Sequence, residues 1–381
     1  MSTLAVPAPG LLDPAEPEPL PTVDQLPALI TRSGLTGRGG AGFPVGAKIA
    51  ALRRAPSTIV ANASEGEPLS AKDAVLLRES PHAVIDGLLL LAGALAPRAG
   101  LTIMVHPRSA AEVRSALAAR PDGRRVQVQV AQERFVAGEA IAVAAALAGG
   151  EQIPADHPHH LTERGLRGGP VLVQNAETLA HVARIARHGA EAFLAAGRPE
   201  DPGTRLVTIA RPEGPETVLE VPGGSTLREV LHLAGTEPGT LDAVLVGGYH
   251  GRWALPDQFD VPLGPRPAPG VLGAGAGVLM LLDRGRCPLP VTTAILDHLA
   301  AESAGQCGPC VLGLPRIAAS MHDLEAGHGD PARLRRRLEA VAGRGACHHP
   351  DGTAQLAGST VTAFGPEFDA HVAGHCTGWR R

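Results

Sequence analysis

The two lysines of this chain stand in neighbouring segments whose other residues are suited to binding a small anion. Lys48 and Lys72 are the only lysines among 34 basic residues, and the rest are arginines. Lys48 ends a glycine-rich run over residues 34–48, and Lys72 lies in an acidic stretch over residues 62–73. An ammonium group is a compact donor and a guanidinium is a flat fork, so the two do not replace each other at a tight site. We interpret this placement as a sign of an anion-binding pocket.

The glycine-rich run contains a match to the dinucleotide-binding fingerprint G-x-G-x-x-G, in Gly37-Arg-Gly-Gly-Ala-Gly42. A Rossmann fold requires this fingerprint between a strand and a helix. Here residues 23–33 have the pattern of a helix, and Phe43-Pro44 interrupts the run, so we do not predict a Rossmann site. The glycines still allow backbone N–H groups to approach a phosphate closely.

The acidic stretch offers hydrogen-bond acceptors. The carboxylates of Glu65 and Glu67 cannot bind phosphate, but they can accept hydrogen bonds from ribose or ribityl hydroxyls, and Asn62 can both donate and accept. Taken alone, such a segment is a solvated turn before a helix. Beside a phosphate-binding loop, it completes a site with the shape of a nucleotide.

Three cysteines near the C-terminus have the spacing of metal ligands. Cys307-Gly-Pro-Cys310 is a C-x-x-C knuckle, and Cys347-His348-His349 follows after a helical stretch. Three thiolates suit an iron–sulfur cluster, or a zinc ion if His348 or His349 is the fourth ligand. An inert, buried C-x-x-C pair is the remaining alternative.

The bulk properties exclude several classes of protein. The 381 residues are 44% hydrophobic and 19% charged, as in an ordinary globular protein of two or three domains. A net charge of −4 and no basic stripe exclude a nucleic-acid-binding surface. Residues 1–26 predict a flexible leader without the features of a signal peptide, and no apolar run approaches the ~20 residues that span a membrane. Cysteines in such a chain indicate metal or redox chemistry in the cytoplasm.

The pattern of elements predicts three regions after the leader. Residues 34–198 read as α/β, with a helix over 81–95 and a β-α-β unit over 101–130. Residues 199–284 begin with the order β-β-α-β, which favours a β-grasp module. Residues 285–381 are mainly helical. Residues 1–33 form the leader and a first helix.

Taken together, the motifs resemble the NADH-binding flavoprotein subunit of respiratory complex I and its hydrogenase and formate dehydrogenase relatives. The segments that carry the resemblance occur in the family's order: Gly37-Arg-Gly-Gly-Ala-Gly-Phe-Pro44 with Lys48, Asn62-Ala-Ser-Glu-Gly-Glu-Pro68, Gly138-Glu139, Gln174-Asn175-Ala-Glu-Thr178-Leu, and Glu302-Ser-Ala-Gly-Gln-Cys-Gly-Pro-Cys310. The resemblance implies an FMN-binding α/β domain, a β-grasp (soluble-ligand-binding) domain and a C-terminal helical iron–sulfur domain.

The resemblance also implies roles for individual residues. It implies that FMN is held by a set of backbone and side-chain groups: Gly37, Arg38, Gly39, Gly40, Gly42, Lys48, Asn62, Glu65, Gly138, Gln174, Asn175 and Thr178. The nicotinamide nucleotide is expected to face Phe43, Glu67 and Glu139. The cluster is expected on Cys307, Cys310 and Cys347.

This chain departs from the family pattern at the cluster and at the nucleotide pocket. Ala304 stands where the family has its first cluster cysteine, so we expect a [4Fe–4S] cluster with an incomplete cysteine set or a [3Fe–4S] cluster. Cys287, Cys376 or a nearby histidine is a candidate fourth ligand, and a neutral ligand would raise the reduction potential of the cluster. On the nucleotide side, Ile49, Ala140, Ser64 and the segment 159–162 replace a tryptophan, a glutamate, an aspartate and a phenylalanine-containing loop. These losses predict weaker binding of NADH than of FMN.

We therefore expect an FMN- and Fe–S-dependent NADH:acceptor oxidoreductase subunit that passes single electrons to a partner protein. The expected partner is a ferredoxin-like or other iron–sulfur subunit within a hetero-oligomer, and any link to a membrane would run through other subunits. The alternatives are a non-catalytic electron-relay or assembly subunit that no longer binds NADH, and a zinc-stabilised binding module.

Overall fold

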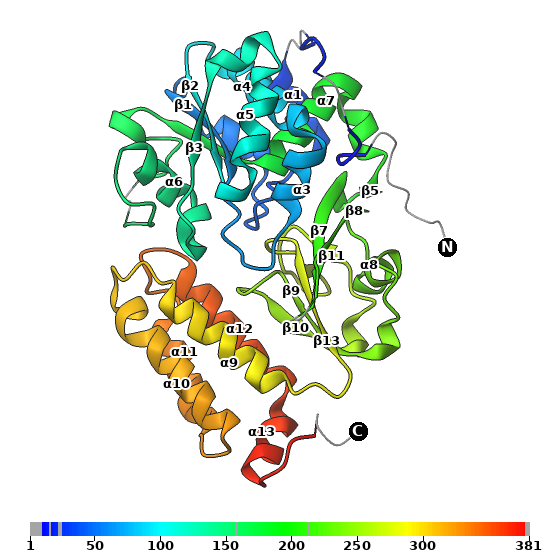
Figure 1. The fold of residues 1–381 in the computed structure, drawn as a ribbon, viewed down its shortest axis with the longest axis vertical. Coiled ribbons are helices and arrows are strands. Elements are labelled where there is room, and N and C mark those ends of the chain that lie inside the picture. Colours follow the sequence, from blue (N-terminus) through cyan, green and yellow to red (C-terminus); the bar gives the residue numbers. More distant parts are fainter. Residues whose placement is uncertain (1–9, 15–16, 22–24, 157–158, 212–213, 378–381) are drawn as a thin grey trace.

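The computed structural model describes residues 10–14, 17–21, 25–156, 159–211 and 214–377. Figure 1 shows an α/β region, a second β-sheet with one helix beside it, and a group of C-terminal helices. The predicted fold class, an α/β domain with a β-grasp domain and a helical C-terminal region, is confirmed.

The first sheet is parallel and has the order β3-β2-β1-β4. Its strands are β1 (Thr58–Ala63), β2 (Gly100–Val105), β3 (Val126–Val130) and β4 (Val171–Asn175). The chain steps outward from β1 to β3 on one side and then returns to place β4 on the other side of β1. In the register of β1 and β4, Asn62 lies opposite Asn175, so the carboxyl ends of these two strands are level.

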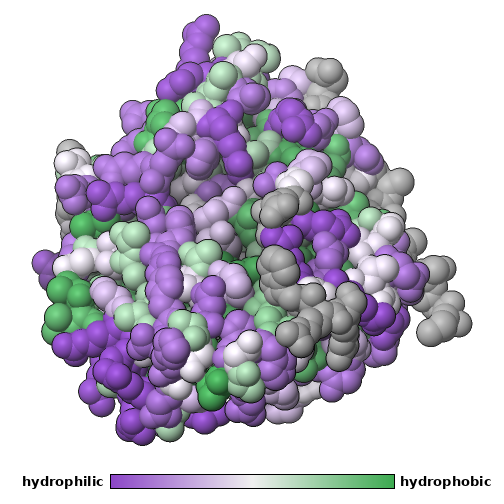
Figure 2. Space-filling model, turned by 60° about the horizontal axis from the view of Figure 1, so that its bottom comes forward, coloured by the Kyte–Doolittle hydropathy of each residue, from purple (hydrophilic) through white to green (hydrophobic). Residues whose placement is uncertain are grey.

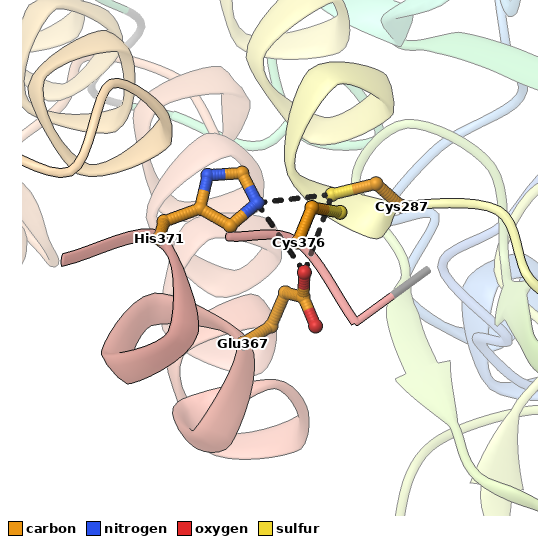
Figure 3. A group of neighbouring side chains, drawn as sticks. All are labelled: Cys287, Glu367, His371 and Cys376. Carbon is orange, nitrogen blue, oxygen red and sulfur yellow. Dashed lines mark hydrogen bonds and ion pairs between the residues drawn. The ribbon is translucent and has the colours of Figure 1, made fainter. Parts of the chain in front are cut away.

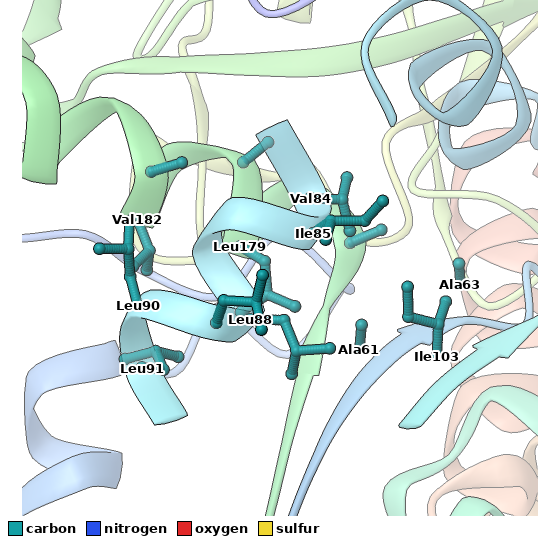
Figure 4. Close-up of a cluster of buried hydrophobic side chains, with 14 of the residues drawn as sticks. Ala61, Ala63, Val84, Ile85, Leu88, Leu90, Leu91, Ile103, Leu179 and Val182 are labelled. Carbon is teal, nitrogen blue, oxygen red and sulfur yellow. The ribbon is translucent and has the colours of Figure 1, made fainter. Parts of the chain in front are cut away.

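Helices cover both faces of this sheet because successive strand residues point to opposite sides. Ile59, Ala61 and Ala63 of β1 join the core formed with α4 (Pro81–Leu95) and α7 (Ala176–Leu194). Figure 4 shows Ala61 and Ala63 in this core. Val60 points the other way, into the core that includes Val143 of α6 (Ala140–Leu147). Helix α4 was predicted at these bounds, since proline suits the first helical turn and an apolar run follows it. It packs so closely on α7 that a Cβ at Gly87 would lie 2.0 Å from the carbonyl oxygen of Leu179.

The glycine-rich run forms a closed loop between two helices. Helix α1 (Leu26–Ser33) precedes it, an antiparallel bridge joins Thr36 to Pro44, and the short helix α2 (Val45–Ala50) follows. The prediction that this run is not a Rossmann fingerprint is confirmed, because no strand leads into it.

The second sheet has the order β10-β9-β13-β7-β8 and is mixed. The first and last of its long strands, β7 (Thr204–Ala210) and β13 (Val278–Asp283), are neighbours and run parallel. Leu279 and Leu281 of β13 pack toward helix α8 (Leu227–Leu233), while Met280 and Leu282 pack toward the C-terminal helices. Burial on both faces explains why this strand is a continuous apolar run.

The C-terminal region consists of α9 (Pro288–Ala301), α10 (Leu314–Glu325), α11 (Pro331–Val341), α12 (His349–Ala363) and α13 (Gly365–Val372). A single π-helical turn, Pro309–Gly313, opens α10, and such turns are frequent at functional sites. The remaining elements are α3 (Lys72–Glu79), α5 (Ala110–Ala118), β5 (Gly197–Arg198), β6 (Asp201–Pro202), β8 (Thr217–Pro222), β9 (Leu241–Val246), β10 (Arg252–Ala254), β11 (Leu263–Gly264), β12 (Leu272–Gly273), and the 3-10 turns Pro107–Ser109, Pro121–Arg125, Phe135–Gly138, Leu166–Gly168, Pro238–Thr240 and Pro256–Gln258.

Part of the predicted leader packs on the body of the protein. Leu11 is buried in the core of the α/β region, and its backbone N–H donates to Glu220 Oε2 at 2.5 Å. Glu18 pairs with Arg187 of α7 at 2.8 Å. The expectation of a flexible leader is therefore wrong for these described residues, whose contacts come from segments far along the chain.

The face of the molecule drawn in Figure 2 is predominantly polar. On the face drawn in Figure 2, hydrophobic residues lie in small separate groups among hydrophilic ones. Within the described ranges, none of the helices combines the length and the apolar composition that crossing a bilayer requires.

Candidate functional site

The predicted FMN residues meet at the carboxyl ends of β1 and β4. Strand order reverses between these two strands, and ligands of open parallel α/β sheets bind in the crevice outside such a switch point. β1 delivers Asn62 to this edge, and β4 delivers Gln174 and Asn175. The topology thus brings together two segments that lie more than a hundred residues apart in the sequence.

Three polar residues of the crevice form one connected network. The side chain of Asn62 donates to the carbonyl oxygen of Gly138 at 2.8 Å. The side chain of Asn175 donates to Asn62 O at 3.3 Å and to Asp73 Oδ2 at 2.9 Å, and its oxygen accepts from the N–H of Glu177 at the start of α7. These bonds fix both asparagines, which were predicted to hold FMN, at the mouth of the sheet.

Gln174 has a donor without an acceptor. The residue is 4% exposed, and its buried Nε2 has no hydrogen-bond partner in the described structure. A buried donor left unpaired costs about 1–3 kcal/mol. Its position at the carboxyl end of β4 makes it the group that most clearly lacks a ligand.

The glycine loop lies directly over the end of β4. A Cβ at Gly39 would come within 3.1 Å of Asn175 Cβ, and one at Gly42 would lie 2.1 Å from the carbonyl oxygen of Pro265 in the β-grasp domain. Gly40 and Gly42 also have φ of 105° and 58°, where side chains are strained. Gly37 closes the loop by donating to Phe43 O at 2.9 Å. The glycines are therefore needed for close approach of the loop to both domains.

Lys48 and Lys72 have opposite environments. Lys48 Nζ donates to the carbonyl oxygen of Val173 at 2.6 Å, and burial lowers its pKa to about 8. Lys72 lies between Asp73 at 3.0 Å and Glu177 at 2.8 Å. Burial alone would lower the pKa of Lys72, but the two carboxylates raise it. The interpretation that both lysines face an anion is wrong for Lys72, which neutralises carboxylates of the protein itself.

Glu65 is also used inside the protein. Its carboxylate accepts from the N–H groups of Asp73 at 2.8 Å and Ala74 at 3.0 Å, and so caps α3. It also accepts from Ser70 Oγ at 2.8 Å and pairs with Arg108 at 2.5 Å. A hydrogen bond from Glu65 to a ribityl hydroxyl, as predicted, would have to replace one of these contacts.

Arg38 and Thr178 contact each other behind the glycine loop. The backbone N–H of Arg38 donates to Thr178 Oγ1 at 2.9 Å, and its guanidinium pairs with Asp201 at 3.1 Å and donates to Pro202 O at 3.0 Å. Burial and the nearby Arg205 lower the pKa of Arg38. The guanidinium therefore joins the α/β region to the β5–β6 turn, and direct contact of its charge with FMN stays a prediction.

Of the three expected nucleotide residues, Glu67 lines a cavity of about 180 Å³, whereas Phe43 and Glu139 do not. Loops at the carboxyl ends of β1, β2 and β3 also line this cavity, together with His298 and Glu302 at the end of α9. The carboxylate of Glu67 accepts from the N–H of Tyr249 at 3.1 Å. Burial raises the pKa of Glu67 to about 8, although this hydrogen bond acts to lower it. Phe43, by contrast, is 47% exposed and lies under the guanidinium of Arg266, 5.4 Å from the ring centre.

The structure places Glu139 against a cluster cysteine. Its carboxylate lies near enough to the thiol of Cys347 for each group to shift the pKa of the other. Burial raises the pKa of Glu139, and burial with the charge of Glu139 raises the pKa of Cys347 to about 12. Gly138, the preceding residue, is the acceptor for Asn62 in the crevice. One dipeptide thus joins the end of β1 to the cysteine region.

The loops around the three predicted cluster ligands direct backbone N–H groups at sulfur. The N–H groups of Ala304 and Gly305 act to lower the pKa of Cys310, those of Ala346 and Cys310 the pKa of Cys307, and that of His349 the pKa of Cys347. Burial would raise the pKa of Cys307, but these N–H groups lower it. Hydrogen bonds to sulfur are one of the means by which proteins stabilise and tune iron–sulfur clusters. The donor set therefore suits a cluster, with Ala304 leaving one corner without a thiolate.

The zinc alternative at these three cysteines receives no support from the neighbouring histidines. The ring of His349 uses one nitrogen toward His250 at 3.1 Å and the other toward Leu299 O at 2.8 Å. The side chain of His348 is 96% exposed. Within the described residues, the three thiols are also not among the groups whose ligand atoms all lie within 4.8 Å, as a single ion requires.

Cys287 and Cys376, the candidate fourth ligands, lie elsewhere. Cys287 caps the start of α9, whereas the loop with Ala304 follows the end of the same helix. The 14 residues of α9 separate the two by about 20 Å at 1.5 Å per residue. Cys376 lies with Cys287. The expectation that either completes the cluster is therefore wrong.

Sequence reasoning missed a group of rings between the three regions. Phe135 lies 4.7 Å from the ring centre of His250 and 5.5 Å from that of His349, and Tyr249 lies 5.5 Å from that of His298. Burial and the nearby His349 lower the pKa of His250 to about 3. No sequence motif predicts this group, because its members come from four separate segments. The one available signal was that aromatic residues make up only 2% of the chain, so each of them is unusual.

Comparison with known proteins gives matches over both the crevice and the cysteine region. The Nuo51 FMN-binding domain matches residues 30–184, and the NADH-ubiquinone oxidoreductase-F iron-sulfur binding region matches residues 290–371. The two descriptions support the cofactors expected from the sequence, namely FMN, NADH and an iron–sulfur cluster.

Whole proteins of similar sequence are subunits of larger enzymes. The NADH-quinone oxidoreductase-F subunit of Streptomyces coelicolor is 30% identical over 377 residues, which cover 92% of this chain and 84% of that protein. The NADP-reducing hydrogenase subunit HndC of Solidesulfovibrio fructosivorans is 28% identical, with 90% of this chain and 75% of that protein covered.

A solved structure has the same fold. A chain of the NAD+-reducing [NiFe]-hydrogenase in its H2-reduced state superposes with a TM-score of 0.79 at 29% identity. The match covers 91% of this chain and 62% of that chain, so this chain spans less than two thirds of its length.

Proposed function

The chain belongs to the family of NADH-quinone oxidoreductase-F subunits, and from this we propose that it is the NADH-oxidising FMN and iron–sulfur subunit of a multi-subunit oxidoreductase. Bound FMN accepts two electrons together as hydride and releases them singly. The observation that carries the proposal is the dipeptide Gly138-Glu139, whose first residue contacts Asn62 in the crevice and whose second contacts Cys347. A flavin and a cluster held at these two points would be neighbours.

The residues of the crevice provide the groups that FMN requires. Lys48 has no carboxylate partner within the described ranges and lies near a loop of close-packed glycines, which suits the phosphate. The unpaired donor of Gln174 and the fixed asparagines Asn62 and Asn175 suit the polar edge of the ring and the ribityl chain. Desolvation holds Lys48 ready for an anion, since a neighbouring negative charge would raise its lowered pKa.

The nicotinamide nucleotide is assigned to Phe43 and Glu67. Phe43 offers an exposed ring for stacking, and Arg266 beside it adds a positive charge. Glu67 provides an acceptor at the wall of the cavity. Ala140 and Ser64 remove two carboxylates relative to the family pattern, so this site binds its nucleotide weakly.

The electron acceptor is a protein with its own iron–sulfur centre. Cys307 is partly exposed, and Val311 and Leu312 on the adjoining turn are 54% and 56% exposed. A cluster bound here is close to the surface, which suits transfer to a partner subunit. Relatives of the chain are named as subunits of larger enzymes, which supports a partner protein.

The test is anaerobic purification followed by titration with NADH in a spectrophotometer. We expect a flavin band that NADH bleaches, with iron and acid-labile sulfide in the protein. In Cys310→Ser, NADH should still bleach the flavin, while the electron paramagnetic resonance signal of the reduced cluster is lost.

Two other outcomes would replace the proposal. A flavin band that neither NADH nor NADPH bleaches would identify an electron-relay or assembly subunit. A colourless protein without iron and sulfide, even after reconstitution, would leave a structural module.

A further inference from the structure

A second group of potential metal ligands lies at the opposite end of α9 from the cluster cysteines. Cys287, Glu367, His371 and Cys376 bring one ligand atom each to within 4.8 Å of all the others. Figure 3 shows the four side chains pointing toward one another from the start of α9, from α13 and from the segment after α13. Cys287 and Glu367 are buried, and the other two are partly buried. None of the four belongs to the flavin or cluster residues described above.

The distances within the group suit one small ion. Cys287 Sγ lies 3.5 Å from His371 Nε2 and 3.8 Å from Glu367 Oε1, and the last two atoms are 3.3 Å apart. In a tetrahedral zinc site, bonds of about 2.0–2.3 Å place neighbouring ligand atoms about 3.3–3.8 Å apart. An iron–sulfur cube needs more widely spaced thiolates. The compact group thus suits a single metal ion, whereas the more widely spaced thiols of Cys307, Cys310 and Cys347 suit a cluster.

The surroundings orient each ligand toward the centre of the group. His371 Nδ1 lies 2.5 Å from the carbonyl oxygen of Glu325 at the end of α10. A carbonyl only accepts, so Nδ1 carries the proton and Nε2 is left with its lone pair facing Cys287. Thr377 donates to the carboxylate of Glu367 through both its backbone N–H, at 3.0 Å, and its hydroxyl. Such outer hydrogen bonds are typical of ligating histidines and carboxylates in metal sites.

Charge gives a second reason for a cation. Two thiols and a carboxylate are crowded into a largely buried volume whose only cationic candidate within the group is His371. A buried carboxylate is costly unless it is paired or hydrogen-bonded, and thiols bind a metal ion as thiolates. A divalent ion would neutralise two thiolates and leave the carboxylate to complete its coordination.

We propose that Cys287, Glu367, His371 and Cys376 bind one Zn²⁺ ion in a structural, four-coordinate site. Four protein ligands leave no open position for a substrate, so the ion has a stabilising role. It fastens α13 and the following segment to the start of α9, at the point where the β-grasp sheet passes into the helical region through β13. This proposal is independent of FMN and NADH binding.

The experiment is metal analysis of the full-length protein, purified without chelator after expression with zinc and iron supplied. We expect close to one zinc per chain in the wild type and loss of most of it in Cys376→Ser. Cys310→Ser is the matched control, because it also removes one thiol from the helical region; it should retain zinc and lose iron. Cys376→Ser should show the reverse, with iron retained.

Cobalt(II) substitution of the wild type keeps the test valid if the variants fold poorly. We expect the visible bands of tetrahedral cobalt together with thiolate-to-cobalt charge transfer, and competition by zinc should remove both. Wild-type protein that takes up less than about a tenth of a zinc per chain, or cobalt that gives only an octahedral spectrum, would overturn the proposal. So would zinc that is lost in Cys310→Ser and kept in Cys376→Ser, or a disulfide between Cys287 and Cys376 in the purified protein.

Discussion

Lys48 and Lys72 are the same residue type in adjoining segments, and the protein uses them in opposite ways. Lys72 is enclosed with Asp73 and Glu177, two carboxylates of the chain itself. Lys48 has one neutral partner, the carbonyl oxygen of Val173, and a pKa lowered to about 8 by burial. A buried charge must be paired, so the lysine that the protein leaves without a counter-charge is the one available to an anionic ligand.

The same contrast separates other groups at the crevice. The carboxylate of Glu65 is fully used in capping α3 and pairing with Arg108. Glu67, two residues later, accepts only from the N–H of Tyr249 among the described residues, and Gln174 has a donor without a partner there. Groups that the fold has satisfied act as scaffold, and groups that it has left unsatisfied mark the site.

The largest effect is expected at Lys72. Replacement by methionine, Lys72→Met, leaves Asp73 and Glu177 buried without their cation. Removing one partner of a buried ion pair typically costs about 3–5 kcal/mol. We expect a loss of that size in the free energy of unfolding, measured by denaturant titration. Lys48→Met is the matched control and should change stability by less than half as much; equal losses in the two variants would remove the distinction between the lysines.

The next effect is a pH dependence at Glu67. Its folded pKa of about 8 lies above the ordinary value of 4.5, so the folded state holds a proton that the unfolded state releases. The contribution of Glu67 to stability should therefore be greatest below about pH 4.5 and fall as the pH rises toward 8, with a slope of at most about 1.4 kcal/mol per pH unit.

Thermal unfolding at a series of pH values tests the contribution of Glu67. Glu67→Gln imitates the protonated form and should flatten the decline between pH 5 and 8, so that the variant is the more stable protein at pH 8. The exposed Glu339 serves as the control site, and Glu339→Gln should keep the wild-type slope. Identical slopes in wild type and Glu67→Gln would show that Glu67 is not desolvated in solution.

The features that the sequence could predict depend on local signals, whereas the ion pairs that distinguish satisfied from unsatisfied groups join distant segments. The bounds of α4 follow from local signals, a proline in the first turn and an apolar run, and so do the strands β2 and β7. The crevice was predicted from motifs that turn out to end neighbouring strands. The pairing of Lys72 with Glu177 spans 105 residues, and that of Glu65 with Arg108 spans 43; no local pattern encodes either.

The cysteines show the same limit. Spacing was sufficient to group Cys307 with Cys310, because a C-x-x-C knuckle is local. Spacing could not group Cys287 with Cys376, since α9 to α13 must first fold and bring the two ends of the region together. Sequence alone offered both as ligands for the cluster, and only the length of α9 shows that the first of them is at the wrong end.

A third prediction concerns the affinity of FMN. Lys48→Met should weaken FMN binding about ten- to hundredfold, since a hydrogen bond to a charged group contributes about 1.5–3 kcal/mol. The measurement is quenching of FMN fluorescence on titration with apoprotein. Lys48→Arg retains the charge but replaces a compact donor by a fork, so it should restore only part of the affinity. Full affinity in Lys48→Met would place the phosphate elsewhere.

The smallest effect is expected at Gln174, where stability and FMN affinity should change in opposite directions. Gln174→Met keeps the approximate size of the side chain and removes the buried donor that lacks a partner. The apoprotein should become more stable by about 1 kcal/mol, while its affinity for FMN falls. Gln129→Met on β3 is the control, because Gln129 Nε2 already donates to Ala146 O at 3.2 Å and its loss should not stabilise the protein. A gain in apoprotein stability together with a loss of FMN affinity is the signature of a group that the fold left unsatisfied for its ligand. A loss of stability in Gln174→Met would instead show that Gln174 is already satisfied without FMN and belongs with Lys72 and Glu65 among the scaffold.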